Sequence, residues 1–171
     1  MRPRQDDEFD QQMIDLSRVT RVMAGGKRMR FRACIVIGDR KGRVGWGLAK
    51  GADVSLAIQK ATAQAKKNII TVSMVKETIP HEVRAKFKAA RLLLKPATAG
   101  KGLIAGGVVR TVLDLAGYKN IVSKMFGSPN KINNVAAVFK ALGMLRRIDA
   151  PAKMTPEEAL AAEEKRKKQQ V

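Results

Sequence analysis

The sequence predicts an α+β protein made of two small domains, a βββα half followed by a βαββα half, and three observations support this prediction. The chain has 171 residues, of which 45% are hydrophobic, so it can bury a core in one ordinary domain or two small ones. In the first half the spacing of apolar residues changes from strand to helix periodicity near residue 53. The pattern then starts again after 76–80, a segment that contains a proline. We therefore expect domains at 13–76 and 81–149, joined by a linker at 77–80.

The first half is expected to begin with two adjacent strands. An extended stretch over 14–22 stops at Gly25 and Gly26, which tolerate the positive φ angles of a tight turn. The strand that follows, 27–37, alternates apolar residues with arginines, which places the arginines on one face and the apolar side chains on the other. One face of this strand therefore packs and the other is cationic. The three arginines are Arg28, Arg30 and Arg32.

A turn over 38–42 leads to a third strand and a helix. The strand, 43–49, carries two glycines on the face opposite Trp46. Asp53 is suited to cap a helix that reaches about Asn68, in which the apolar residues recur every three or four positions. We expect the apolar stripe of this helix to cover the three-stranded sheet.

In the second half, residues 83–89 alternate apolar and basic residues, which predicts a strand. Val83, Phe87 and Leu94 are also spaced as in part of a helix, so a helix is the alternative for this segment. A glycine-rich loop is expected at 96–107.

The rest of the second half repeats the alternation of helix and strand. A helix over 108–116 is ended by Gly117, because glycine readily takes the left-handed conformation after the last helical turn. A strand over 118–126, a turn over 127–131 and a helix over 133–145 follow.

The two ends of the chain differ from its body. Residues 1–12 are interpreted as an acidic extension, and 150–171 as a charged helical tail. The tail starts at Thr155-Pro156-Glu157-Glu158, which matches a capping box with proline at the first helical position. A solvated appendage is the first interpretation of this tail, and a contact with a partner is the alternative.

The charge of the chain indicates a polyanionic partner. There are 34 Lys and Arg against 15 Asp and Glu, a formal net charge of +19. The stretch 16–150 holds 27 of these basic residues and 6 of the acidic ones, a net charge of +21. Such a field attracts nucleic acid, since neutralised phosphates release condensed counterions. A membrane partner is not expected, because the sequence lacks both a run of about 18 apolar residues and a helix that pairs a basic with a strongly apolar face.

The sequence offers little catalytic chemistry. With one histidine, His81, and one cysteine, Cys34, it provides neither a legible acid–base arrangement nor enough ligands for zinc. Cys34 lies in an apolar run and is expected to be a buried structural thiol. The stretch 100–105 fits G-x-G-x-x-A, but no acidic residue follows at about 20 positions, and Lys101 is not followed by Ser or Thr. We expect no enzyme, cofactor, metal or small-molecule substrate.

Compartment and binding mode follow from composition. A single cysteine and the lack of an apolar leader favour a cytoplasmic protein. Aromatic residues make up only 4% of the chain, so phosphate and 2′-OH contacts are expected rather than base stacking on an aromatic platform. A basic run is often only a solvated face, but here the strands 28–32 and 84–88 both present a fully cationic face. The basic candidates for RNA binding are Arg18, Arg21, Lys27, Arg28, Arg30, Arg32, Lys41, Arg43, Lys50, Lys60, Lys67, Arg84, Lys86 and Lys88.

Several co-linear motifs over about residues 10–148 resemble the family of the bacterial small-subunit ribosomal protein number five. In the first half these motifs are Ser17-Arg18-Val19-Thr20-Arg21-Val22, Gly25-Gly26-Lys27 and Gly42-Arg43-Val44-Gly45-Trp46-Gly47. In the second half they are Leu92-Leu93-Leu94-Lys95-Pro96-Ala97, Gly102-Leu103-Ile104-Ala105-Gly106-Gly107-Val108-Val109-Arg110 and Gly127-Ser128-x-Asn130-x-Ile132-Asn133.

The resemblance implies a fold and a place of action. The first domain would be similar to a double-stranded-RNA-binding domain, and the second would contain a left-handed βαβ crossover, against the usual right-handed rule. The protein would bind ribosomal RNA (rRNA) between the head and the body of the small subunit, beside small-subunit proteins four and eight and near the mRNA entry channel, and would support translational accuracy. A free RNA-binding regulator or RNA chaperone is the alternative function.

The resemblance also adds site residues. The family loop that influences spectinomycin sensitivity matches Val19, Thr20, Gly25 and Gly26, although Ala24 stands where a lysine is frequent. Further candidates for rRNA contact are Thr20, Gly25, Gly26, Ser128, Asn130 and Asn133. The surface that faces protein four in the family corresponds here to Gly102, Gly106, Gly107 and Arg110.

Overall fold

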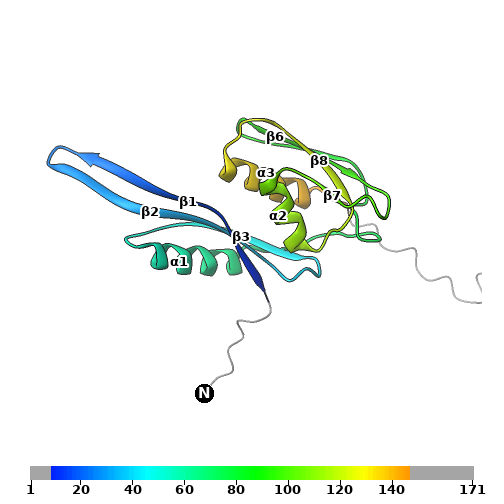
Figure 1. The fold of residues 1–171 in the computed structure, drawn as a ribbon, viewed down its shortest axis with the longest axis horizontal. Coiled ribbons are helices and arrows are strands. Elements are labelled where there is room, and N and C mark those ends of the chain that lie inside the picture. The colour runs from blue at the N-terminus through cyan, green and yellow to red at the C-terminus, as the bar shows by residue number, and fades with distance from the viewer. Residues whose placement is uncertain (1–8, 147–171) are drawn as a thin grey trace, which may run out of the picture.

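The computed structural model describes residues 9–146 and confirms the α+β class, with two sheets and three helices in the described part of the chain (Figure 1). The first sheet has the antiparallel order β1-β2-β3-β4 and is joined by helix α1. Its elements are β1 (Asp10–Met23), β2 (Gly26–Gly38), β3 (Arg43–Gly51), α1 (Val54–Lys67) and β4 (Ile69–Thr71). The second sheet has the order β5-β6-β8-β7. Its elements are β5 (Val83–Phe87), β6 (Ala90–Pro96), β7 (Leu103–Ile104), α2 (Gly107–Ala116), β8 (Ile121–Gly127) and α3 (Lys131–Gly143).

The second half departs from the predicted βαββα order, because three strands precede its first helix. The predicted strand 83–89 is the first arm of a hairpin that turns at Lys88, where φ is +52°, and returns as β6. Leu92 and Leu94 face the core while Leu93 points outward, and this outward leucine hides the alternation of β6. The two-residue β7 lies inside the predicted glycine-rich loop. It pairs in parallel with β8, and α2 lies between these two strands in the chain, so the three form a βαβ unit. The left-handedness of this unit stays a prediction.

Smaller differences concern the ends of elements. Strand β1 begins at Asp10, inside the segment interpreted as an acidic extension, and it carries a register shift between Met13 and Asp15. Strand β4 was not predicted, because three residues are too few to show a period. The predicted helix at 133–145 begins and ends two residues earlier. The predicted tail helix lies outside the described residues, and the domain boundaries stay predictions.

Helix α1 packs on a stripe of glycines in β3. A Cβ atom at Gly45 would lie 2.5 Å from the carbonyl oxygen of Ala65, and one at Gly47 would collide with the carbonyl of Ala61. At Gly51 a Cβ would lie 2.5 Å from the backbone nitrogen of Ala57. Glycine on the strand and alanine every four residues on the helix therefore let the two backbones approach unusually closely. The helix covers the sheet as predicted.

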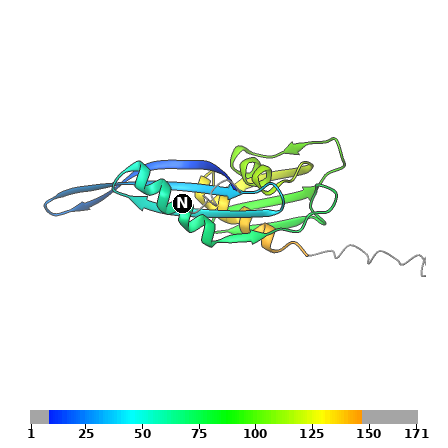
Figure 2. The same ribbon diagram turned by 90° about the horizontal axis from the view of Figure 1, so that it is seen from below.

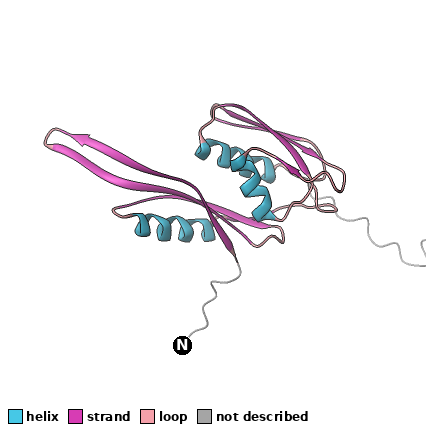
Figure 3. Ribbon diagram, viewed as in Figure 1, coloured by secondary structure: helices cyan, strands magenta, loops and turns pink. Residues whose placement is uncertain are grey.

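The opposite face of the first sheet packs against the second domain. Cys34, Val36 and Val44 lie in one continuous buried cluster with Leu113 of α2 and Val138 of α3. Figure 3 shows the resulting layers: α1, the first sheet, the helices α2 and α3, and the second sheet. The two halves therefore share a core.

The turn between β2 and β3 joins the two halves through the backbone. The N–H groups of Arg40 and Gly42 donate to the carbonyls of Leu115 and Ala116 at the end of α2, both at 3.0 Å. These carbonyls have no partner inside the helix, so the turn caps α2. Gly117, at φ +96°, lies so close to the carbonyl of Arg40 that a Cβ would collide with it.

Candidate RNA-binding surface

Strands β1 and β2 extend beyond the body of the molecule as a hairpin (Figures 1 and 2). Every residue from 20 to 30 is exposed. Residues opposite each other in an antiparallel pair share a face of the sheet, so the register decides which cations lie together. The opposed pairs on one face are Arg21 with Arg28, Val19 with Arg30, Ser17 with Arg32, and Arg32 with Lys50 of β3. We call Arg21, Arg28, Arg30, Arg32 and Lys50 the arginine face.

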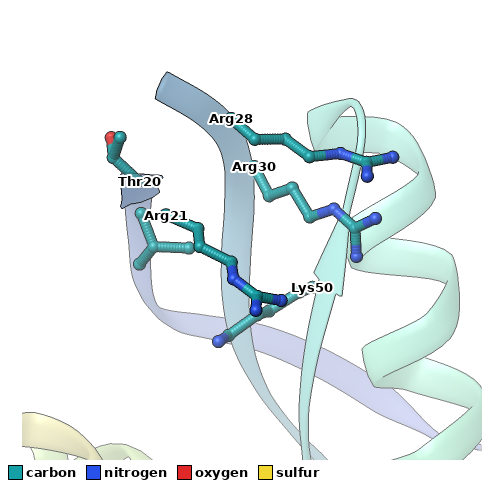
Figure 4. A pocket seen from close by; sticks show the side chains of 6 residues that line it. Thr20, Arg21, Arg28, Arg30 and Lys50 are labelled. Atoms are coloured by element: carbon teal, nitrogen blue, oxygen red, sulfur yellow. The ribbon is translucent and has the colours of Figure 1, made fainter. Parts of the chain in front are cut away.

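A depression of about 260 Å³ lies on this hairpin, lined by Val19, Thr20, Arg21, Arg28, Arg30 and Lys50 (Figure 4). No carboxylate is among its lining residues. In Figure 4 the side chains of Arg21 and Lys50 converge, while that of Thr20 points away from the other labelled residues. Cations gathered in a concave site repel one another and concentrate anions, so the depression favours a phosphate.

Two polar atoms beside this depression are buried and lack a hydrogen-bond partner within the described part of the chain. They are Nε of Arg32 and Oγ of Ser17, and these two residues are directly opposed. A buried N–H group without an acceptor is costly and uncommon. The Arg32 guanidinium therefore adds positive charge beside the depression, while its Nε is shielded from solvent.

The register divides the predicted RNA-binding residues between the two faces of the hairpin. Arg18 opposes Phe31 and Lys27 opposes Val22, so both lie on the face that carries α1. Thr20 opposes Met29 and shares that face. The helix residues predicted for the site, Lys60 and Lys67, are exposed on α1. The hairpin thus presents cations on both sides.

Arg43, predicted as an RNA-binding residue, is held by partners within the chain. Its Nε donates to Oδ2 of Asp39 at 2.6 Å, and its guanidinium lies 5.0 Å from the ring centre of Phe9. Burial alone would raise the pKa of Asp39, but hydrogen bonds from Arg43 and Lys41 and the charge of Arg43 outweigh it and lower that pKa. Lys41 is exposed in the same turn.

The predicted polar residues after β8 form a helix cap. The side chain of Asn130 accepts hydrogen bonds from the backbone N–H groups of Ile132 and Asn133, at 3.0 and 3.4 Å. The hydroxyl of Ser128 accepts from the N–H of Asn130 at 3.2 Å. Asn130 is therefore the N-cap of α3, and RNA contact by Ser128, Asn130 and Asn133 stays a prediction.

The predicted protein-partner residues lie together where β7 leads into α2. The N–H of Gly102 donates to Oδ1 of Asn120 at 3.1 Å, and Nη2 of Arg110 donates to the carbonyl of Leu103 at 3.3 Å. A Cβ at Gly106 would collide with the methyl group of Met125, whereas Gly107 is exposed and open. The structure brings these four residues to one surface, and the partner itself stays a prediction.

A second basic surface is larger than the sequence indicated. Arg84 and Lys86 of β5 were predicted, and Lys88 lies in the turn after that strand. Pairing of β5 with β6 and of β6 with β8 adds cations that were not predicted to lie there, because β6 was not recognised. We call the exposed side of this sheet the outer sheet face. Its members on β5, β6 and β8 are Arg84, Lys86, Arg91, Leu93, Lys95, Val122, Lys124 and Phe126.

The cysteine behaves as expected for a structural residue. Cys34 is buried, and burial, followed by the charge of Asp15, raises its pKa to about 11. The thiol is thus protonated at neutral pH and is a poor nucleophile. Among the described residues no three His, Cys, Asp or Glu side chains lie close enough to hold a metal ion. No described helix is long and apolar enough to span a membrane.

Comparison with known proteins identifies both halves of the chain. The family model described as "Ribosomal protein S5, N-terminal domain" matches residues 9–73, and "Ribosomal protein S5, C-terminal domain" matches residues 85–155. The chain is 47% identical over 148 residues to small ribosomal subunit protein uS5c of Spinacia oleracea. This match covers 86% of this chain and 48% of that protein. It is 49% identical over 148 residues to small ribosomal subunit protein uS5 of Mycoplasma mobile, covering 86% of this chain and 61% of that protein.

The chain spans about half to three fifths of the length of these two curated relatives. The two domain matches follow one another in the same order as the two sheets. The matched family consists of structural ribosomal proteins rather than enzymes, as the sequence predicted. Both halves of the chain are accounted for by one family, and the chain therefore belongs to the ribosomal protein S5 family.

Proposed function

We propose that this chain is a non-enzymatic structural constituent of the small ribosomal subunit in the cytoplasm and that its hairpin binds small-subunit rRNA. The observation that carries the proposal is the arginine face, where register brings five cations together without a carboxylate in the adjoining depression. The two relatives are named as small ribosomal subunit proteins, which supports the same assignment.

The shape of the hairpin suits a cleft in folded RNA. A two-stranded ribbon is thin, and cations on both of its faces allow it to neutralise phosphates of two RNA segments at once. At the tip, a Cβ added to Gly25 would have no other atom within 4 Å, and Gly26 has φ +152°. The tip therefore brings bare backbone close to RNA, where side chains would keep it away.

We place the protein at the junction of head and body, near the mRNA entry channel, with mRNA close by. The surface formed by Gly102, Gly106, Gly107 and Arg110 contacts small-subunit protein four, and protein eight is a second neighbour. Contacts that hold this junction bias the equilibrium between subunit conformations. Changes in the hairpin would thus alter translational accuracy without touching the codon.

Removal of cations from the arginine face tests the rRNA assignment. The double variant Arg28→Ala, Arg30→Ala should bind small-subunit rRNA more weakly, and the slope of log K against log salt should fall in magnitude by about one to two, since about 0.7 to 0.9 counterions are released per phosphate contact. Filter binding at several salt concentrations measures both quantities. The control, Lys101→Ala with Lys119→Ala, removes the same number of positive charges from exposed positions elsewhere, of which Lys119 is paired with Glu77. An equal loss in the control would mean that only net charge matters.

Sedimentation distinguishes a ribosomal constituent from the alternative of a free RNA-binding regulator. In a sucrose gradient of a cell extract at physiological salt, the tagged full chain should travel with small subunits. Recovery of the chain only at the top of the gradient would contradict the proposal. The double variant should shift toward the top if the hairpin supplies a main contact.

A further inference from the structure

The outer sheet face of the second domain is open to solvent, unlike its inner face, which packs on α2 and α3. Cross-strand pairing arranges its side chains in rows. One row runs Lys86, Arg91, Phe126 across β5, β6 and β8. The next row runs Arg84, Leu93, Lys124, and a third contains Lys95 and Val122.

Phe126 stands at the end of the first row with about half of its surface exposed (49%). Two depressions, of about 450 and 500 Å³, adjoin on this face, and Lys86, Arg91 and Phe126 line both of them. Leu93 lines the first and Lys88 the second. An exposed aromatic ring therefore lies in a hollow whose charged lining side chains are all cations.

The acidic residues of the described chain leave this row uncompensated. Glu82, at the margin of the sheet, pairs with Arg84 at 3.1 Å and with Lys95 at 3.4 Å. Lys86 and Arg91 form no ion pair among the described residues. The amine of Lys140 on α3 donates to the backbone carbonyl of Lys86 at 3.1 Å and adds a cation at the edge of β5, on the side that carries α3.

We propose that the outer sheet face binds an unpaired segment of small-subunit rRNA, with one base stacked on Phe126 and the adjoining phosphates on Lys86 and Arg91. An exposed ring on a flat sheet can accept a base only when that base is free of its own stack, which selects single strands over duplexes. The cations select a polyanion and supply no sequence preference. An acidic protein segment would satisfy the charges but would leave the aromatic ring without a matching partner.

This site goes beyond the proposed function of the hairpin, because it lies on the other sheet and uses a different kind of contact. The low aromatic content of the chain makes a platform that stacks several bases unexpected. One aromatic ring is nevertheless enough to stack one base. Arg84, Lys86 and Lys88, which the sequence predicted only as phosphate ligands, belong to or adjoin this one surface. One stacked base per site is the expected stoichiometry.

Fluorescence of a stacked base tests the site directly. The probe is a single-stranded RNA nonamer carrying 2-aminopurine, titrated with the full chain in the Arg28→Ala, Arg30→Ala background so that the hairpin contributes little. Stacking on Phe126 should quench the fluorescence. Phe126→Leu should abolish the quench and weaken binding at least about fivefold, because stacking contributes strongly per base. Phe126→Tyr should restore both, and Leu56→Ala, which removes an exposed apolar side chain on α1, should change neither.

Three outcomes would overturn the proposal. In the first, Phe126→Leu binds the nonamer as tightly as its parent does. In the second, Phe126→Leu loses as much affinity for an RNA duplex of the same sequence as it loses for the single strand. The third is displacement of the nonamer by a glutamate peptide in a Phe126-dependent way, which would indicate an acidic protein partner instead. Because the hairpin variants are scored separately, failure of this site leaves the hairpin assignment intact, and failure of the hairpin assignment leaves this one intact.

Base reactivity in assembled subunits tests the source of the RNA. Subunits reconstituted with Phe126→Leu should show one or a few unpaired rRNA nucleotides with increased chemical reactivity relative to subunits with the parent chain. An unchanged rRNA pattern, or a change confined to bound mRNA, would contradict the assignment to rRNA. In subunits that carry Arg28→Ala and Arg30→Ala, the chemical reactivity should change at other rRNA nucleotides.

Discussion

The first sheet buries both faces near its centre, under α1 on one side and α2 with α3 on the other, and it exposes its charge where β1 and β2 run past that core. The second sheet buries one face only and exposes its charge across the other. The first arrangement gives a projecting arm with cations on two sides, and the second gives a flat platform with an aromatic ring. The difference teaches that one net charge can be presented as two kinds of surface, for which we propose two kinds of RNA contact.

The largest expected effect breaks the packing that makes this difference possible. In Gly47→Ala the new methyl group would meet the backbone of α1, which cannot move without losing the contacts of Ala57 and Ala65. Overpacking of this kind costs about 3 kcal/mol of unfolding free energy. Urea denaturation measures the loss. Gly107→Ala is the matched control, since nothing lies within 4 Å of its Cβ position and alanine favours a helix.

A smaller effect is expected where the two sheets are joined through the turn of residues 38–42. Gly117→Ala would place a methyl group against the carbonyl of Arg40 at φ +96°, but this turn can shift more easily than a helix. We expect a loss of about 2 kcal/mol and a separation of the unfolding of the two halves. Calorimetry should show two transitions in place of one. Gly100→Ala, with φ +87° and open surroundings, controls for backbone strain alone; an equal loss there would contradict a role for the junction.

The smallest effect concerns the ion pair in that turn and depends on pH. The side chain of Asp39 is 4% exposed, and its folded-state pKa lies below the ordinary value of 3.8. It therefore stabilises the fold above pH 3.8, and this contribution is lost as the pH falls through the folded-state pKa. Asp39→Asn should cost about 1 to 2 kcal/mol at pH 7.

The pH course of that difference is the decisive measurement. Denaturation of the parent chain and of Asp39→Asn at several pH values should show a gap at pH 7 that closes in strong acid. A gap that stays constant down to pH 2 would mean that the carboxylate charge contributes nothing. Asp114→Asn, at an exposed position on α2, should leave the unfolding free energy nearly unchanged at every pH.

The sequence predicted the first three strands and α1 because glycine turns separate the strands, β2 alternates apolar residues with arginines, and the apolar residues of α1 recur every three or four positions. It did not predict β4 and β7, which are too short to show a period, or β6, where Leu93 faces outward and breaks the alternation. The cations of the hairpin were all recognised, but their division between two faces depends on the pairing of β1 with β2.

The sequence did not predict the outer sheet face, because that surface also depends on the pairing of strands. Lys86 and Arg91 lie five residues apart on the two arms of one hairpin, but Phe126 is distant in sequence and joins them only through the strand order β5-β6-β8. Two local signals were readable. Asp39 lies four residues before Arg43 across a turn, and Asn130 directly precedes a helix, which favours a capping role over contact with RNA.

The core shared between the two halves has a consequence for synthesis. A chain leaves the ribosome from its N-terminus, so β2 and β3 are complete before α2 and α3 have been translated. Until then Cys34, Val36 and Val44, which later pack on those helices, form an open apolar surface on the nascent chain. The new protein therefore passes through a stage that favours binding by chaperones, and it closes this surface only when α3 has emerged.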